Sequence, residues 1–192
     1  MNEEKVFYFA NIDQRNTEKV LEVVKRYAVA NNIRTIVIAS TQGQTGVKAC
    51  EVFPPSEFNL IIVTHHAGFR APGEIELLPE NREQIETQGA KILIASHAFS
   101  GIERAVRKEL TTWLPLELFA KILRLFGEGT KVCVEITVMA ADAHLIPMDG
   151  SDIIAIAGTG RGADTAWVIS PVHSNNFFDM KLKKLLCKPE IW

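Results

Sequence analysis

The sequence predicts an α/β fold: a three-layer, doubly wound, mostly parallel sheet with helices on both faces and an antiparallel hairpin at one edge. Its 192 residues, 47% of them apolar, suffice for one core, so we expect a single domain over residues 1–192. Short apolar runs alternate with helical patterns, as in parallel sheets. Two late runs are joined by a glycine-rich connection that is too short for a crossover helix, which predicts antiparallel pairing there.

The first predicted elements are a strand at Val6–Ala10 and a helix that ends near Asn32, with Asn16 as its N-cap. The next strand is expected at Thr35–Ala39, whose unbroken apolar run is typical of a strand covered on both faces. A loop at His65–Leu78 is expected further on. The other elements expected up to residue 95 are a helix at 47–52, a strand at 60–63, a helix at 79–88 closed by Gly89, and a strand at 92–95.

The second half of the chain continues the alternation. The pair of strands at 153–157 and 166–169 forms the expected edge hairpin. A basic segment, Met180–Lys188, is expected to be a short helix. The remaining predicted elements are helices at 101–110 and 115–126 and a strand at 132–139.

Composition excludes several classes of protein. The formal net charge is −2 and no basic stripe is present, which disfavours a nucleic-acid-binding protein. No apolar run approaches the roughly 18 residues that a membrane span needs, and the N-terminus is acidic where a secretory signal is basic, so a cytoplasmic location is expected. The three cysteines, Cys50, Cys133 and Cys187, are far apart, which disfavours both a disulfide framework and a thiolate metal site.

A glycine-rich loop between the strand at 35–39 and the next helix is the strongest local signal. Its glycines allow backbone N–H groups to converge, and the helix dipole favours an anion at that point. A Walker A ending is absent, so nucleotide hydrolysis is not implied. The alternative is an ordinary tight turn. The candidate binding residues are Ser40, Thr41, Gln42, Gly43, Gln44 and Thr45.

A second glycine-rich loop follows the strand at 153–157. Its spacing fits a dinucleotide-binding motif, but no helix follows, so we reject that interpretation. Its guanidinium group can bind an anion through two hydrogen bonds, although a plain hairpin turn with a solvated arginine remains possible. The candidate residues are Gly158, Thr159, Gly160, Arg161, Gly162, Ala163, Asp164 and Thr165. Both loops follow carboxyl ends of strands, where open α/β sheets bind ligands.

Taken together, the two loops resemble those of the C-terminal domain of pyruvate kinase. The matching stretches are Thr35–Val47, Leu60–Thr64 and Ser151–Val172. In the kinases this domain is regulatory and its loops hold a phosphorylated effector. The sequence departs from that pattern at Gln42–Thr45 and in the longer segment after His65. Kinase activity is not implied, because it belongs to a separate barrel of typically about 250 residues.

The whole chain is similar to small stand-alone archaeal and bacterial proteins with this domain, which are associated with flavin mononucleotide (FMN) and have no assigned role. The resemblance implies FMN as a cofactor and homo-oligomerisation. It also implies that the site includes both loops and two further stretches. These stretches are the turn His65, His66, Ala67 and Gly68, and the segment from Met139 to Asp142.

Histidines and carboxylates supply the candidate catalytic residues: His66, His97 and Asp142. Like them, His65 and His144 lie at or after predicted strand ends, but their spacing does not favour a metal site. Glu135 interrupts an apolar run, so it is either a buried, hydrogen-bonded carboxylate or an exposed one on an edge. Asp142 either belongs to the site or caps a turn.

Three functions remain open from the sequence. The first is binding of a phosphate-bearing cofactor or metabolite, with FMN the first candidate. The second is a small flavin-dependent enzyme that uses a strand-end His or Asp142 for proton transfer. The third is an oligomeric assembly or effector-sensing module. Three aromatic residues could stack on a flavin, although aromatic residues more often fill a core. They are Phe69, Phe99 and Trp167.

Overall fold

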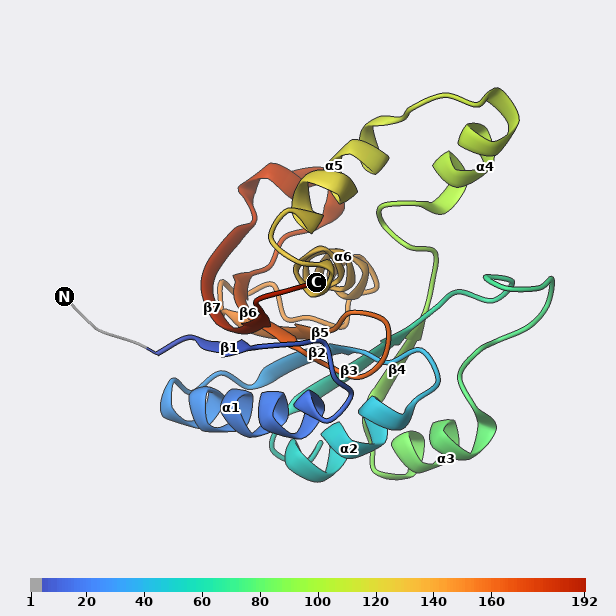
Figure 1. Ribbon diagram of the computed structural model, residues 1–192. Coiled ribbons are helices and arrows are strands. Elements are labelled where there is room, and N and C mark those ends of the chain that lie inside the picture. Colours follow the sequence, from blue (N-terminus) through green and yellow to red (C-terminus); the bar gives the residue numbers. More distant parts are fainter. Residues whose placement is uncertain (1–4) are drawn as a thin grey trace.

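The computed structural model describes residues 5–192, which form an α/β fold around a mixed sheet (Figure 1). Over these residues the sheet has seven strands in the order β1-β7-β6-β5-β2-β3-β4. Only β6 runs against its neighbours, because it pairs antiparallel with both β5 and β7. The strands are β1 (Phe7–Phe9), β2 (Thr35–Ala39), β3 (Asn59–Thr64), β4 (Lys91–Ile94), β5 (Ile153–Ala157), β6 (Thr165–Ser170) and β7 (Lys181–Pro189).

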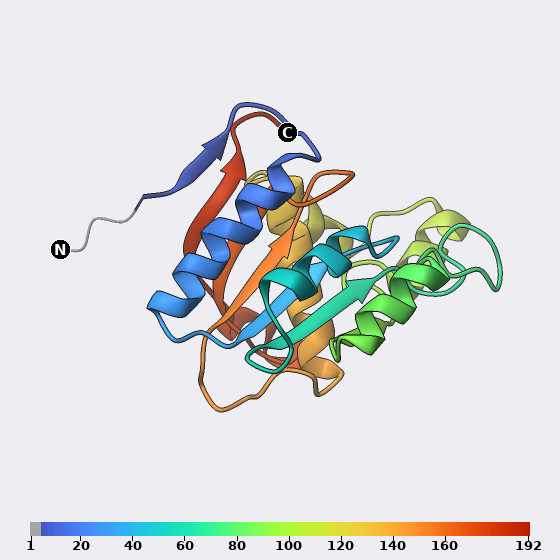
Figure 2. The same cartoon turned by 90° about the horizontal axis from the view of Figure 1, so that it is seen from below.

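Helices cover both faces of the sheet (Figures 1 and 2). One face carries α1 (Asn16–Ala30), α2 (Gln44–Val52) and α3 (Pro79–Thr87). The opposite face carries α6 (Glu128–Asp142), on which α5 (Pro115–Arg124) packs. The 3₁₀ helix η1 (Ser174–Asp179) also contacts α6, whereas α4 (Gly101–Leu110) projects beyond the sheet.

The core is divided by the sheet into two layers. Ile36 and Ile38 of β2 contribute to the apolar cluster under α1 and α2, and Val37 contributes to the cluster under α6. All three side chains are fully buried. The prediction that the strand at 35–39 is covered on both faces is therefore confirmed.

The expected strand at Val132–Met139 is wrong, because these residues lie within helix α6. Twelve of the fifteen residues of α6 are buried, since the helix is covered by the sheet on one side and by α5 and η1 on others. A helix that is buried nearly all round has no polar stripe, so its sequence resembles that of a buried strand.

The expected helix at Met180–Lys188 is also wrong, because residues 181–188 belong to strand β7. It pairs antiparallel with β6 through a register that is shifted at two points, which disturbs the regular alternation of side chains. As a result, the hairpin of β5 and β6 is not at an edge: β7 and β1 extend the sheet beyond it. The edge strands are β1 and β4.

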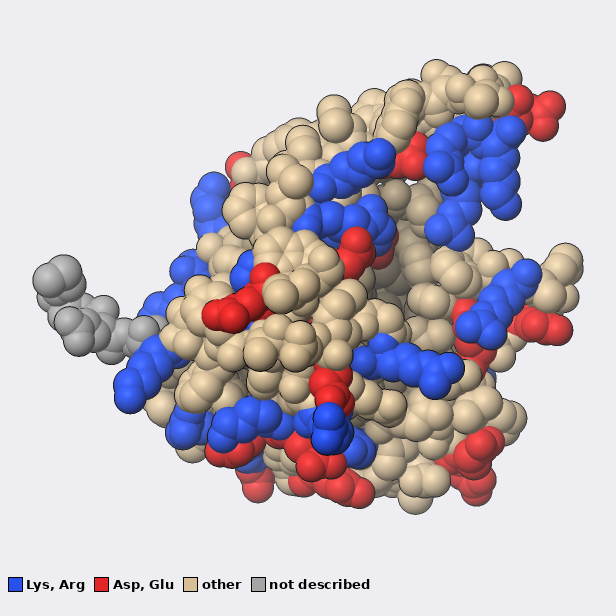
Figure 3. Space-filling model, viewed as in Figure 1, with Lys and Arg blue, Asp and Glu red and all other residues tan. Residues whose placement is uncertain are grey.

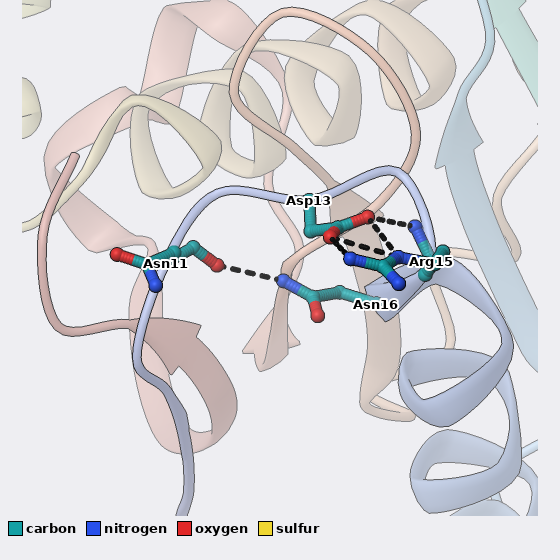
Figure 4. Close-up of polar contacts among 4 residues, drawn as sticks. All are labelled: Asn11, Asp13, Arg15 and Asn16. Atoms are coloured by element: carbon teal, nitrogen blue, oxygen red, sulfur yellow. Dashed lines mark hydrogen bonds and ion pairs between the residues drawn. The ribbon is translucent and has the colours of Figure 1, made fainter.

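The turn before α1 differs in detail from the prediction. Arg15, not Asn16, occupies the N-cap position. Asn16 donates from Nδ2 to the carbonyl oxygen of Asn11 at 2.9 Å, and Arg15 is paired with Asp13 (Figure 4). The hydrogen bonds from Arg15 lower the pKa of Asp13 to about 2. This turn carries Gln14 to the carboxyl edge of the sheet, where it lines the cavity described next.

Candidate functional site

A cavity of about 750 Å³ lies at the carboxyl ends of β2, β3, β4 and β5. Figure 3 shows this face of the molecule hollowed beneath α4, with Lys and Arg side chains near the opening. Both glycine-rich loops line the cavity, although more than a hundred residues separate them in the sequence. The lining residues from the two loops are Ser40, Thr41, Gln42, Gln44, Thr45, Gly158, Gly160, Arg161 and Gly162.

The first loop is held rigidly from outside the cavity. Gly43 has a φ of 100°, and a Cβ there would lie 2.5 Å from that of Asn81, so only glycine fits without displacement. Asn81 also donates from Nδ2 to the carbonyl oxygen of Gln42 at 2.8 Å. The Ser40 hydroxyl accepts from the N–H of Gly46 at 3.0 Å.

The first turn of α2 therefore begins at a fixed position on the cavity wall. Its residues Gln44 and Thr45 both line the cavity. N–H groups in a first helical turn have no acceptor within their own helix, and the helix dipole is positive at this end. This combination is suited to a phosphate group.

The second loop is fixed by contacts with α1. The N–H of Ala163 donates to the hydroxyl of Thr17 at 2.9 Å, and a Cβ on Gly162 would lie 2.5 Å from the same oxygen. Within the loop, Asp164 accepts from the N–H of Thr159 at 2.8 Å and from the hydroxyl of Thr165 at 2.6 Å. Thr159, Ala163, Asp164 and Thr165 are not among the lining residues, so they support the loop rather than face the cavity.

Arg161 is an exposed guanidinium group at the mouth of the cavity. Of the five other lining cations, Arg104 lies near the Phe69 ring and the remaining four are paired with carboxylates: Arg70 with Glu76, Arg107 with Glu117, Arg124 with Glu128, and Lys131 with Glu135. Within residues 5–192, Arg161 makes no ion pair with a carboxylate. Its charge is thus available to an anion in the cavity, which the α2 N-terminus also lines.

An imidazole cluster lies on the wall formed by the ends of β3 and β4. The ring centroid of His65 lies 4.1 Å from that of Phe69 and 5.1 Å from that of His97. His65 and Glu76 interact through Nδ1 and Oε2 at 2.6 Å. Burial lowers the pKa of His97 to about 4, so this imidazole is neutral near pH 7.

The adjacent residue His66 belongs to the same cluster but does not line the cavity. Its ring centroid lies 5.4 Å from that of His97, and its Nδ1 is 2.7 Å from the carbonyl oxygen of Ala67. Gly68 is likewise outside the lining and donates its N–H to the carbonyl oxygen of Glu74 at 2.8 Å. The histidine that faces the cavity from this turn is therefore His65.

A buried ion pair between Lys131 and Glu135 lies at the base of the cavity. Glu135 is 4% exposed and also accepts from the N–H of Phe99 at 3.0 Å. Burial lowers the pKa of Lys131. Of the two interpretations of Glu135, the buried and hydrogen-bonded one is confirmed, although the residue lies on a helix and not in the sheet.

Asp142 lies outside the cavity lining, whereas Met139, on the same helix, is part of it. Asp142 accepts from the N–H of Ser174 at 3.0 Å and contacts Nδ1 of His173 at 3.3 Å. It therefore fixes the start of η1, in agreement with the turn-capping interpretation. His144 is exposed and is not a lining residue either.

Of the three aromatic residues that could stack on a flavin, two line the cavity and one does not. Phe69 and Phe99 line the cavity, but Trp167 does not, and its Nε1 donates to the hydroxyl of Thr130 at 3.0 Å. The guanidinium carbon of Arg104 lies 5.0 Å from the centroid of the Phe69 ring, so Phe69 lies close to both Arg104 and His65.

Sequence reasoning missed several lining residues, above all Glu76 and Arg70. They belong to the loop between β3 and α3, and no sequence motif distinguishes them from solvated charges.

Within the described part of the chain, no group of three or more His, Cys, Asp or Glu side chains is arranged to hold a metal ion. Over the same residues, no helix has both the length and the apolar character needed to cross a membrane. No protein-family model matches the chain.

Proposed function

We propose that the cavity binds a phosphate-bearing small molecule, with the phosphate at the N-terminus of α2 and beside Arg161. The observation that carries this proposal is the convergence of both glycine-rich loops on one cavity, together with a guanidinium group that has no carboxylate partner within residues 5–192. Backbone N–H groups and guanidinium groups are the donors that proteins commonly use for phosphate.

FMN is the first candidate ligand, on the sequence resemblance. The cavity volume of about 750 Å³ lies within the range of roughly 300 to 1,000 Å³ that is usual for ligand sites. The residues fit the group in two respects: the α2 N-terminus suits its phosphate, and Phe69 and Phe99 are aromatic side chains in the cavity lining. FMN would supply redox chemistry of its own when bound.

The first experiment is native mass spectrometry with an absorbance spectrum of the untagged protein. We expect a bound phosphorylated molecule that is lost in a Thr41→Ala/Arg161→Ala variant. Arg15→Ala is the matched control, because Arg15 is an exposed arginine near the same edge that pairs with Asp13 and does not line the cavity (Figure 4). A colourless protein that neither carries nor takes up FMN or inorganic phosphate would contradict the proposal.

A second candidate function, an assembly module, is favoured by exposed apolar side chains on and around α5. We propose homo-oligomerisation through this surface. Its test is light scattering after size-exclusion chromatography. A Leu118→Glu/Leu125→Glu variant should have a lower molar mass in solution than the wild type. The most exposed of these side chains are Trp113 (66%), Leu118 (55%), Leu125 (72%), Phe126 (56%) and Phe178 (79%).

A further inference from the structure

The imidazole cluster contains a histidine that a carboxylate holds in one tautomer. Nδ1 of His65 lies 2.6 Å from Oε2 of Glu76, and Glu76 is only 9% exposed. The other carboxylate oxygen of Glu76 forms an ion pair with Nε of Arg70 at 2.8 Å. An ionised carboxylate can only accept hydrogen bonds, so Nδ1 of His65 carries the proton. The lone pair of neutral His65 is therefore on Nε2, as in a histidine that acts as a general base.

A second imidazole with a different protonation behaviour lies beside it. His97 lines the same cavity, and the two ring centroids are 5.1 Å apart. Burial holds the pKa of His97 at about 4, so near neutral pH this ring is a neutral hydrogen-bond donor and not a cation. A base next to a neutral imidazole donor is one arrangement suited to enolisation, the base for the carbon-bound proton and the imidazole for the carbonyl oxygen.

The cluster is also close to the proposed phosphate position. His65 follows β3, and the phosphate loop follows β2, its direct neighbour in the sheet. Adjacent strands are about 4.8 Å apart. The two strand ends are joined by a hydrogen bond of 2.7 Å from the hydroxyl of Thr64 to the carbonyl oxygen of Thr41. A ligand anchored by its phosphate at α2 needs only a short carbon chain to reach His65.

We infer that the protein catalyses proton transfer on a small phosphorylated hydroxycarbonyl compound, with His65 as the general base, Glu76 as its positioning residue and His97 as the donor to the carbonyl oxygen. Nε2 of His65 removes a proton from the carbon beside the carbonyl group. The electron pair of that C–H bond forms a carbon–carbon double bond, and the carbonyl π pair moves to its oxygen. The proton then adds to the former carbonyl carbon through the electron pair of the double bond. The hydroxyl proton on the first carbon moves to the former carbonyl oxygen, and the electron pair of that O–H bond forms the new carbonyl group on the first carbon, so the net reaction is an isomerisation without oxidation or reduction.

This inference rests on the proposed phosphate site, so its test measures binding and chemistry separately. The protein is incubated in D₂O with dihydroxyacetone phosphate, erythrose 4-phosphate and ribose 5-phosphate. Proton NMR follows the loss of the C–H signal beside the carbonyl group, and phosphorus NMR follows binding. His65→Gln should slow exchange by at least about 100-fold while binding is retained. Glu76→Gln should slow the exchange by roughly 10- to 100-fold, because His65 loses the carboxylate that orients its ring.

The matched control is His144→Asn, which changes an exposed histidine outside the cavity and should give exchange at the wild-type rate. Melting curves establish that each variant is folded. Exchange that persists unchanged in His65→Gln, or a wild-type protein that binds these compounds but exchanges none, would overturn the inference. A wild type that binds inorganic phosphate but none of these three compounds would also overturn the inference and would leave the phosphate site intact. A wild type that binds neither inorganic phosphate nor FMN would refute the phosphate site itself.

Discussion

Helices α6 and α4 show two ways in which a helix can belong to this fold. Twelve of the fifteen residues of α6 are buried, whereas none of the ten residues of α4 is. Helix α6 is held by apolar contacts with the sheet. Helix α4 is held by polar contacts with α5: Glu103 accepts from the N–H of Leu116 at 3.1 Å, and Arg107 pairs with Glu117 at 2.9 Å.

The difference separates the part of the cavity that the core fixes from the part that can move. Lys131, Glu135 and Met139 of α6 line the base of the cavity, and Glu103, Arg104 and Arg107 of α4 line its outer wall. Segments with few buried apolar contacts open at low free-energy cost. We therefore expect substitutions in α6 to act on global stability and substitutions in α4 to act on access to the cavity.

The largest expected effect is that of breaking the buried ion pair in α6. Glu135→Leu should lower the free energy of unfolding by about 3 to 5 kcal/mol, because it leaves the buried ammonium group of Lys131 without its carboxylate. Denaturant unfolding measures the change. The double variant Lys131→Met/Glu135→Leu should recover much of the loss, and a double variant as unstable as the single one would contradict this explanation.

A comparison of isoleucines on the two helices should give the next largest difference. Ile136 of α6 is 3% exposed, and its replacement by alanine should cost about 2 to 4 kcal/mol through lost contacts and a cavity. Ile102 of α4 is 84% exposed, and its replacement should change stability by less than about 0.5 kcal/mol. If both variants lose the same free energy of unfolding, then Ile102 of α4 is covered in solution.

The third prediction concerns pH, because His97 precedes α4 and is influenced by Glu135 of α6. Its pKa is about 4 in the folded protein and near the ordinary histidine value of 6.5 in the unfolded chain, so the unfolded chain binds the additional proton between these values. Stability should therefore rise as pH increases from 4 to 6.5, by about 1 to 3 kcal/mol. In His97→Gln this part of the pH dependence of the free energy of unfolding should vanish. If that free energy still rises with pH as steeply as in the wild type, the prediction is refuted.

The smallest expected effect is that of releasing α4. Arg107→Ala removes its half-exposed ion pair with Glu117 and should change the free energy of unfolding by less than about 1 kcal/mol. Amide hydrogen exchange in α4 should nevertheless become faster, while exchange in α6 stays unchanged. If exchange accelerates equally in both helices, the two do not open independently.

The parts of the fold that were predictable are those in which local pattern and tertiary environment agree. Strands at 35–39 and 153–157 and the helix at 101–110 have the predicted bounds, because breakers or caps flank each of them. Helix α6 was not predictable from periodicity, since burial on nearly all sides removes the polar stripe that identifies a helix. Strand β7 was missed because its shifted register places Lys183 and Lys184 next to each other on the outside.

The candidate site also has a part that is predictable from the sequence and a part that is not. Loops that follow carboxyl ends of parallel strands must meet at one edge of the sheet, so the convergence of the two glycine-rich loops was predictable. The sequence favours a strand that ends near Asp142, and such a strand end would lie at the site. Asp142 is instead the last residue of helix α6 and lies outside the cavity lining. Glu76 reaches His65 only because the loop after β3 folds back, which no local pattern encodes.

The pairing of β1 with β7 has a consequence for the order in which the chain folds. β1 is an edge strand whose sole strand partner in the described sheet is β7, and Phe7 pairs with Cys187. β1 therefore has no place in the described sheet until β7, which lies far later in the sequence, has been made. Contacts between such distant segments form late and slowly. During synthesis, α1 and the strands up to β5 can assemble before β1 has a strand partner, and the formation of β7 lets β1 join the sheet.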